Sequence, residues 1–297
     1  MPAAPAPRRR AEVLAATPTL FDRDGELDNA ATGKLLAHLA GRVDGVFIAG
    51  TTGEFPALSR AERRTLAEAA VAAFGPDRVV VHAGAASTRE AVAILRDAAA
   101  LGARRFAALT PYYLPSDAAA VHRHFAAIAD AARETGSALY GYLFEERSGV
   151  EIGPDDFAAI AAQTGVAGAK LSGTAANNFA RYRHALPPAA ELWSGADTDL
   201  ANVVHAGGAG VVSGLSSAFP EPFMALADAV AADDANAESA AQTRADEVLR
   251  ALAGTPQGIK LALHHLGIGS PDMRMPHPEV LPAARTLIAE LAAAART

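Results

Sequence analysis

Lysine is rare in this chain, and one of its three lysines stands where an amine can act as a nucleophile. Lys170 ends the run Val166-Ala-Gly-Ala, whose small and apolar residues predict a buried strand. Desolvation disfavours the charged form of an amine at the dry end of a strand, and an uncharged amine attacks carbonyl carbons. Lys34 and Lys260 lie in helix-like segments, where we predict ordinary amphipathic or surface positions. The alternative is a structural Lys170 that reaches solvent or pairs with a carboxylate.

Glycines and hydroxyl groups follow another predicted strand, in the motif Gly50-Thr51-Thr52-Gly53-Glu54. The glycines let the backbone approach a ligand closely, and the threonine hydroxyls lie beside exposed N–H groups. The motif therefore suits a carboxylate or a phosphate, with Gly50, Thr51 and Thr52 as candidate ligand-binding residues. A tight turn after the strand is the alternative. The motif lacks the Gly-Lys-Ser/Thr ending of a P-loop, so nucleotide hydrolysis is not supported.

Tyrosines and an arginine follow two further strands. In Thr110-Pro-Tyr-Tyr113 a phenol could relay protons, since a tyrosine hydroxyl both donates and accepts, or the tyrosines could form a packed rim. Tyr140 and Tyr142 are two residues apart and share one face of their strand, while Gly141 faces the other way. Arg147 in the next loop could bind a carboxylate through two hydrogen bonds, or pair with the neighbouring glutamates in solvent.

Composition excludes several other kinds of chemistry. The 297 residues include no cysteine, which excludes disulfides, thiolate catalysis and cysteine-ligated zinc. The histidines, His82 and His124 among them, lack metal-ligand spacing, so we expect structural or surface groups and no metal. A net charge of −7 disfavours nucleic acid and anionic membranes as partners, and no apolar run is long enough to span a membrane. Residues 1–10 carry prolines and arginines where a signal peptide needs an apolar core, so we expect a disordered, solvated tail and a cytoplasmic protein.

Short apolar runs alternate with Ala-rich segments of helical periodicity, a pattern typical of repeated βα units. Eight strands are predicted, over Val13–Ala16, Gly45–Ala49, Val79–His82, Arg105–Leu109, Ala138–Tyr142, Val166–Lys170, Leu192–Ser194 and Gly210–Ser213. Helices are predicted to begin near Asp28, Ser59, Ser87, Asp117, Pro154, Thr174, Asp197 and Phe219. Ser59-Arg-Ala-Glu62 and Ser87-Thr-Arg-Glu90 match the capping box that closes a helix start.

Eight such pairs without a break in composition predict the α/β fold of a (β/α)8 TIM barrel over residues 11–232. Residues 233–297 are helical in pattern, with turns at their prolines, and we expect a C-terminal helical extension. In such a barrel, the side chains that follow the carboxyl ends of the strands meet at one face. The motifs described above all occupy such positions, which places them in one candidate site.

In this order, the motifs resemble those of the dihydrodipicolinate synthase and N-acetylneuraminate lyase family of pyruvate-dependent class I aldolases. The resemblance extends from about Thr17-Pro18 to beyond Lys260. It rests on segments at or after the strand ends: Gly50-Thr-Thr-Gly-Glu54, Thr110-Pro-Tyr-Tyr113, the Tyr142 to Gly149 loop, Lys170, Ser194-Gly195-Ala-Asp197 and Gly210-Val-Val-Ser-Gly214.

The resemblance implies a Schiff base between Lys170 and the keto carbon of pyruvate or another 2-keto acid, with no cofactor. Thr51 and Thr52 would hold the pyruvate carboxylate. Tyr142 would move protons in a relay with Thr51 and Tyr113. Tyr113 would reach into the site of a neighbouring subunit, which implies a homodimer or a homotetramer.

The resemblance also implies residues for the rest of the pocket. Gly195 and Val212 would line it through backbone contacts, and Arg147 would bind the acidic end of the second substrate. The sequence departs from the family pattern near that second substrate. Tyr142-Leu-Phe-Glu145 replaces the usual Tyr-Asn-x-Pro, and Leu171 follows the lysine in place of a polar residue. These changes make the second-substrate end of the pocket more apolar and add an acidic residue near it.

Several interpretations stay open. Arg147 favours a dihydrodipicolinate synthase-like condensation of pyruvate with an aldehyde. The altered loop after Tyr142, and Val211-Val-Ser-Gly-Leu215, favour a 2-keto-3-deoxy sugar-acid aldolase or an N-acetylneuraminate lyase-like enzyme. Tyr140 is a rival to Tyr142 for the catalytic phenol. A catalytically inactive barrel that binds a keto acid is the alternative from another functional class.

Overall fold

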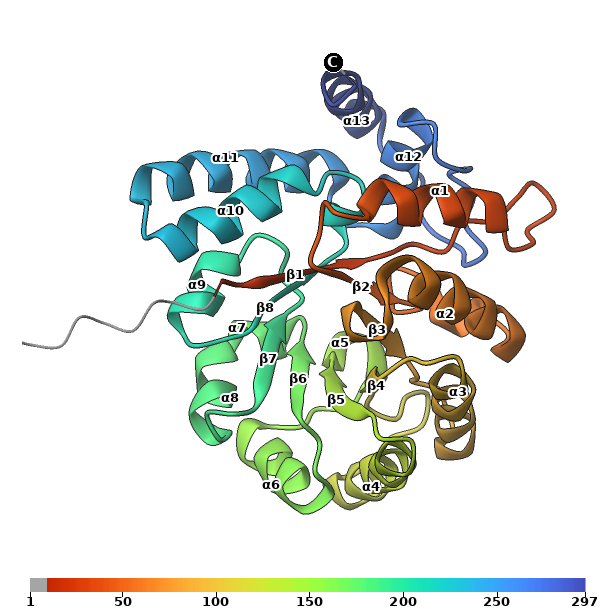
Figure 1. Cartoon of the computed structure of the whole chain (residues 1–297), viewed down its shortest axis with the longest axis vertical. Helices are drawn as coiled ribbons and strands as arrows, with labels where there is room; N and C mark the ends of the chain where they lie inside the picture. Colours follow the sequence, from red (N-terminus) through yellow and green to blue (C-terminus); the bar gives the residue numbers. More distant parts are fainter. Residues whose placement is uncertain (1–9, 297) are drawn as a thin grey trace, which may run out of the picture.

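The structure, a computed structural model, describes residues 10–296, which form a closed barrel of parallel strands ringed by helices (Figure 1). Each strand pairs with the next in sequence, and the last returns to the first, with Glu12 beside Gly210. The strands are β1 Glu12–Ala16, β2 Gly45–Ile48, β3 Val79–His82, β4 Arg105–Leu109, β5 Ala138–Leu143, β6 Gly168–Leu171, β7 Glu191–Ser194 and β8 Gly210–Ser213. The (β/α)8 barrel and all eight predicted strands are confirmed.

Helices cover the outside of the barrel and continue beyond it. They are α1 Asn29–Leu39, α2 Arg60–Phe74, α3 Thr88–Ala100, α4 Ala118–Glu134, α5 Glu145–Ser148, α6 Pro154–Thr164, α7 Thr174–Asn177, α8 Phe179–Ala185, α9 Leu200–His205, α10 Glu221–Ala232, α11 Ala235–Leu252, α12 Pro256–His265 and α13 Pro282–Ala294. The short α5 was not predicted. The single helix expected from Thr174 is two helices, α7 and α8, which meet at Asn178.

Side-chain caps explain where six of the helices begin: α1, α2, α3, α4, α11 and α12. Ser59 and Glu62 form the complete capping box at the start of α2. Ser87 accepts the N–H of Glu90 at the start of α3, but residues 10–296 show no return bond from the Glu90 carboxylate. The helix expected near Asp197 begins later, at Leu200, because the Asp197 carboxylate accepts hydrogen bonds from the β8 end instead of capping a helix.

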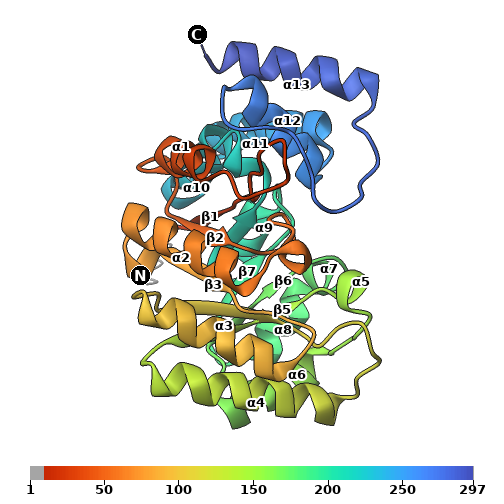
Figure 2. The same cartoon turned by 90° about the vertical axis from the view of Figure 1, so that its right-hand side faces the viewer.

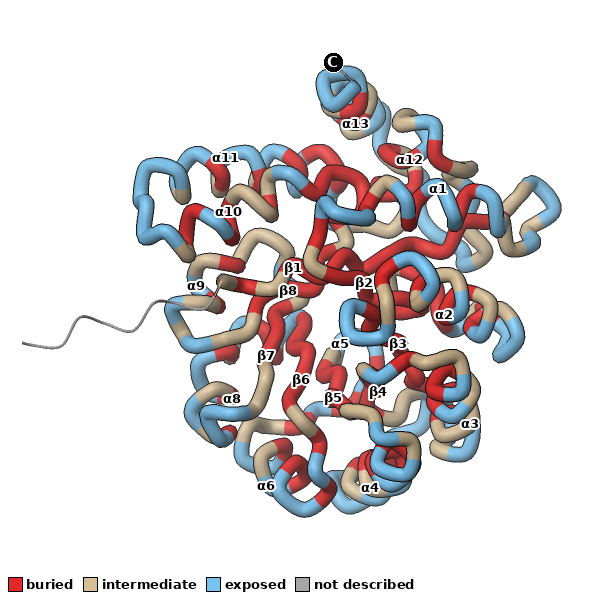
Figure 3. The backbone as a smooth tube through the Cα atoms, viewed as in Figure 1, coloured by how far each residue is buried: buried red, intermediate tan, exposed pale blue. Residues whose placement is uncertain are grey.

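Two apolar layers hold the barrel together. Alternate strand residues point inward and pack as one cluster, which includes Leu14, Phe47, Tyr142 and Trp193. The other strand residues point outward and pack against the helices in a second, larger cluster. In Figure 3 the strands are mostly buried, while buried and exposed residues alternate along the helices. Gly141 faces the outer layer as predicted, since a Cβ there would touch Phe157.

The C-terminal helices follow the barrel without an intervening linker, because α11 lies side by side with α10 (Figure 1). Figure 2 shows α13 at the far end of the molecule from α4. Between α12 and α13, residues 266–281 contain no helix or strand and run back along the barrel. None of the helices between residues 10 and 296 is long and apolar enough to cross a membrane. The division at residue 232 and the cytoplasmic location stay predictions.

Residues 1–9 of the predicted tail lie outside the described part of the chain. The tail's last residue, Arg10, is half-buried and held by ion pairs, so for this residue the prediction of a disordered, solvated end is wrong. The Arg10 guanidinium donates to the Asp44 carboxylate at 2.7 and 2.8 Å and to Asp228 at 2.6 Å. These bonds fasten the start of β1 to the loop before β2 and to α10.

Candidate active site

Lys170 points into the barrel from β6, while its neighbours Ala169 and Leu171 point outward into the helix layer. Its Nζ lies 4.3 Å from the ring centroid of Tyr142 and 4.6 Å from that of Phe47. Only 6% of Lys170 is exposed, and it lines a cavity at the carboxyl ends of the strands. Within residues 10–296 its amine makes no ion pair or hydrogen bond. The amine is therefore dry, unpaired and open to a ligand.

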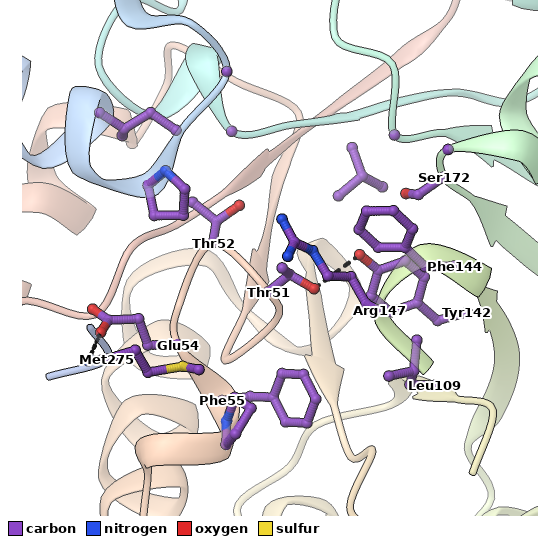
Figure 4. A pocket seen from close by; sticks show the side chains of 18 of the residues that line it. Thr51, Thr52, Glu54, Phe55, Leu109, Tyr142, Phe144, Arg147, Ser172 and Met275 are labelled. Carbon is purple, nitrogen blue, oxygen red and sulfur yellow. Dashed lines mark hydrogen bonds between the residues drawn. The ribbon is translucent and has the colours of Figure 1, made fainter. Parts of the chain in front are cut away.

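The cavity has a volume of about 440 Å³ and is walled by the loops that follow the strands and by the segment between α12 and α13. Figure 4 shows the side chains around it. It contains most of the predicted site residues. Seven of the nine line it: Lys170, Tyr142, Thr51, Thr52, Arg147, Gly195 and Val212.

The strand register explains why Tyr142, and not Tyr140, lies beside the lysine. Tyr142 on β5 pairs with Lys170 on β6, so the two side chains enter the barrel at the same level. The Tyr142 hydroxyl lies 3.1 Å from Thr51 Oγ1, as Figure 4 shows. Tyr140 lies two residues below and donates its hydroxyl hydrogen bond to Glu191 at 2.6 Å, against the ring of Trp193. The geometry therefore favours Tyr142 over its rival as the phenol of the site.

Gly195 follows β7 and leaves room for the lysine side chain. A Cβ at this position would clash with Ser172 Oγ at 2.2 Å and would make a tight contact with Lys170 Cε at 3.2 Å. The Gly195 N–H donates to the Leu171 carbonyl at 2.7 Å, which fixes the close approach of the two loops. Any side chain here would push against the methylene next to the amine.

Asp197, which was not among the predicted site residues, also lines the cavity. Its carboxylate accepts hydrogen bonds from Ser213 Oγ at 2.6 Å and from the Leu215 N–H at 3.0 Å. Burial raises the pKa of this carboxyl, partly offset by these hydrogen bonds and by the charge of Lys170. Its place two residues after Gly195, at a strand end, was the sequence signal that could have identified it.

Arg147 and Phe144 form the outer wall of the cavity, on and beside the short helix α5. The Arg147 guanidinium lies over the Phe144 ring at 5.7 Å from its centroid. Arg147 does not pair with its neighbouring glutamates in the part of the chain that the structure describes. The Glu146 carboxylate instead accepts from the backbone N–H and the hydroxyl of Thr174, both at 2.8 Å. Arg147 is thus an available cation at the mouth.

Two predicted site residues lie outside the cavity of this chain. Gly50 is buried just after β2, where a Cβ would lie 2.6 Å from the Phe47 ring, so its lack of a side chain leaves room for that ring. Tyr113 is 89% exposed and has a φ of 80°, a left-handed conformation that is costly for an aromatic residue. Its neighbour Tyr112 lines the cavity instead.

The prediction that Lys260 is an ordinary surface position is wrong. Lys260 is fully buried, and its ammonium donates to Glu54 Oε1 at 2.5 Å and to the Asp272 carbonyl at 2.8 Å. The other Glu54 oxygen accepts the Met275 N–H at 2.7 Å. Desolvation lowers the pKa of Lys260, against the opposing effect of Glu54. Leu263, three residues further along the helix and on the same face, was a signal that this face is covered.

This ion pair fastens the segment 271–277 across the cavity, where Met273, Met275, Pro276 and His277 form part of the wall. Arg274 secures the same segment on its other side: its guanidinium stacks on Phe21 at 4.2 Å and pairs with Glu62 at 2.5 Å. Sequence reasoning missed this wall entirely. Among residues 10–296, no group of three or more His, Asp or Glu side chains could hold a metal ion.

Similar proteins show which family the chain belongs to. The model of the dihydrodipicolinate synthetase family matches residues 9–295. The chain belongs to this family. It is therefore an enzyme, a lyase of the pyruvate-dependent aldolase type that its motifs indicate.

Individual relatives are similar over nearly the whole chain. A 4-hydroxy-tetrahydrodipicolinate synthase of Parasynechococcus marenigrum is 32% identical, over 99% of this chain and 98% of its own. An uncharacterised DapA-like lyase of Halobacterium salinarum is 33% identical, over 87% and 85%. The solved 4-hydroxy-tetrahydrodipicolinate synthase of Methylacidiphilum fumariolicum is 26% identical, with a TM-score of 0.86, over 96% of this chain and 95% of its own.

Proposed function

We propose that the Lys170 amine forms a Schiff base with the keto carbon of pyruvate. The observation that carries the proposal is an unpaired, buried amine beside the Thr51–Tyr142 hydroxyl pair in an open cavity. Attack of Nζ on the keto carbon forms a C–N bond, and loss of the keto oxygen as water leaves an iminium ion. Because the iminium accepts electrons from the adjacent methyl carbon, the reaction requires no cofactor.

The hydroxyl pair is suited to the proton transfers of this reaction. The keto oxygen must gain two protons to leave as water, one from the attacking amine and one from an acid, and a further proton must leave the methyl carbon before that carbon can attack an aldehyde. Tyr142 lies beside the amine, and its hydroxyl can exchange protons with Thr51 Oγ1. Thr52 lies on the same loop and lines the cavity, where its hydroxyl can bind the pyruvate carboxylate. Gly195 and Val212 complete the wall near the lysine.

We further propose that the second substrate is an aldehyde with an acidic end, as in a synthase that condenses pyruvate with aspartate semialdehyde. The available Arg147 guanidinium at the mouth supports this choice, since it can bind a carboxylate through two hydrogen bonds. The name of the Parasynechococcus marenigrum relative, a 4-hydroxy-tetrahydrodipicolinate synthase, supports it as well. Under this proposal, the more apolar wall built by Phe144 and the 271–277 segment changes the fit of the second substrate and leaves the pyruvate end intact.

The proposal includes a homodimer, which could pair further into a tetramer. Tyr113 is almost fully exposed in a strained conformation next to the cavity-lining Tyr112, and such strain persists where a function requires it. In the proposed dimer, Tyr113 enters the neighbour's cavity and extends its Thr51–Tyr142 relay. Light scattering should then show a dimer or larger, and a strictly monomeric active enzyme would contradict this part.

Borohydride trapping tests the proposed function. Protein mixed with pyruvate and reduced should gain the mass of one reduced pyruvate imine, located on the peptide that contains Lys170. Turnover is then measured with pyruvate and either aspartate semialdehyde or a short sugar aldehyde. Turnover with only the sugar aldehyde would move the assignment to a sugar-acid aldolase. Thermal stabilisation by pyruvate without an adduct or turnover would favour an inactive binding protein instead.

A further inference from the structure

His82 is a buried histidine that the proposed chemistry does not use. It ends β3, and none of its surface is exposed. Its ring makes edge contacts with Phe55 at 4.6 Å and with Tyr142 at 5.6 Å between centroids, and it lies 6.1 Å from Phe47. The imidazole is therefore packed between the loop that carries Thr51 and the ring of Tyr142.

One ring nitrogen of His82 holds the start of that loop. Nδ1 lies 3.0 Å from the carbonyl oxygen of Ala49, and since a carbonyl only accepts, Nδ1 carries the proton. Ala49 has a φ of 51°, a left-handed conformation that alanine adopts only under constraint. Thr51 follows two residues later. The hydrogen bond thus stabilises the strained turn that directs the Thr51 hydroxyl toward Tyr142.

The other ring nitrogen shows that packing alone does not explain this histidine. Nε2 is buried without a hydrogen-bond partner in residues 10–296, and it faces Gly84, where a Cβ would lie 2.5 Å away. Burial lowers the pKa of His82 well below its usual value, so the ring is neutral. Burying an unpaired nitrogen among aromatic rings costs stability that phenylalanine would not lose. What histidine adds here is the N–H that Ala49 accepts.

We propose that His82 is a positioning residue for the Thr51–Tyr142 pair, acting through the Ala49 carbonyl. Its kinetic consequence rests on the proposed function of that pair. The loop has separate anchors along its length: His82 holds its start, Thr19 Oγ1 donates to the Gly53 carbonyl at 2.7 Å, and Lys260 holds Glu54 near its end. Loss of the first anchor should misplace Thr51, which relays protons, more than Thr52, which binds the carboxylate.

Two variants separate the N–H from the ring. His82→Phe keeps the ring packing and removes the donor. His82→Asn removes the ring and keeps an amide that can reach the position of Nδ1. The Phe variant should lower kcat about tenfold to a hundredfold, with a nearly unchanged KM for pyruvate and an unchanged thermal midpoint. The Asn variant should recover most of kcat despite a lower midpoint.

A merely structural His82 gives the opposite order, with the Asn variant worse in both activity and midpoint, and that result would overturn the proposal. A kcat within about twofold of wild type for the Phe variant would also overturn it. Failure of the proposed function is recognised separately, because the wild type would then form no pyruvate adduct. Hydrogen exchange of the Glu54 and Phe55 amides still tests the anchor in that case, with faster exchange expected only in the Phe variant.

Discussion

Two buried lysines lie in opposite settings in this barrel. Lys170 contacts the faces of two aromatic rings, has no partner among residues 10–296, and borders the cavity. Lys260 is fully buried, donates to a carboxylate and a carbonyl, and also lies over a ring, that of Phe21 at 4.5 Å. Burial by itself therefore does not make a lysine reactive. The lysine suited to nucleophilic attack is the one whose charge is not neutralised by a bound carboxylate.

The largest expected effect comes from the unpaired lysine. Lys170→Met fills the space between the two rings but has no amine, so trapping with pyruvate should give no adduct. Activity should fall about a thousandfold or more, because the covalent step is lost. The exposed Lys34→Met is the matched control and should form the full adduct. An adduct on the Lys170 variant would show that another amine reacts, and it would contradict the contrast between the two buried lysines.

The paired lysine should matter for stability. Lys260→Met leaves the Glu54 carboxylate buried without its ammonium, which should lower the free energy of unfolding by about 3–5 kcal/mol. Adding Glu54→Gln to the Met variant removes the unpaired charge and should recover part of this loss. Urea denaturation of the two single variants and the double variant measures the coupling. If Lys260→Met and the double variant lose the same free energy of unfolding, the unpaired Glu54 charge does not account for the loss of stability.

The two tyrosines on β5 allow the same comparison within one strand, because Tyr142 lies beside Lys170 and Tyr140 does not. Tyr142→Phe removes the hydroxyl beside Lys170 and Thr51 and should lower kcat about a hundredfold. Tyr140→Phe removes a hydroxyl that bonds Glu191 at the other end of the barrel, so it should affect the thermal midpoint and leave kcat within about twofold. Steady-state kinetics of both variants decides between them. A larger kcat loss for the Tyr140 variant would reverse the assignment.

Asp197 gives the smallest expected effect and one that depends on pH. Its folded pKa is raised above the usual 3.8, so the folded protein binds this proton more tightly than the unfolded chain does. Below pH 3.8 the carboxyl is protonated in both the folded and the unfolded state, so it costs no stability. As the pH rises through the folded pKa, ionisation of the buried carboxyl destabilises the folded protein. Asp197→Asn should therefore raise the thermal midpoint near neutral pH, with the gain disappearing as the pH approaches 3.8. A gain independent of pH would contradict the assignment.

The barrel and half of its site were predictable because they depend on local pattern. Eight apolar runs and the caps at Ser59 and Asp28 set the strands and helix starts, since strand burial and N–H capping act within a few residues. Lys170 was recognisable because it ends an apolar run. The Gly50 to Glu54 motif was recognisable because glycine and threonine occur together at a strand end. Such signals can be recognised from the sequence alone.

The rest depends on pairs that are distant in sequence. Lys260 and Glu54 are 206 positions apart, and only the packing of α12 against the β2 loop brings the ammonium to the carboxylate. The choice between Tyr140 and Tyr142 depends on the register with β6, which no single strand encodes. Tyr113 looked like its neighbour Tyr112 in sequence, but the turn of the loop exposes one and places the other in the cavity.

The sequence by itself determined the fold class, the family and the identity of the candidate nucleophile, because periodicity and strand-end motifs are local properties of the chain. The tertiary structure decided which lysine is paired, which tyrosine faces the amine, and which segment closes the cavity. It also showed His82 between Ala49 and Tyr142. These choices depend on how strands align and loops meet in three dimensions, where desolvation and hydrogen bonding decide what each side chain can do.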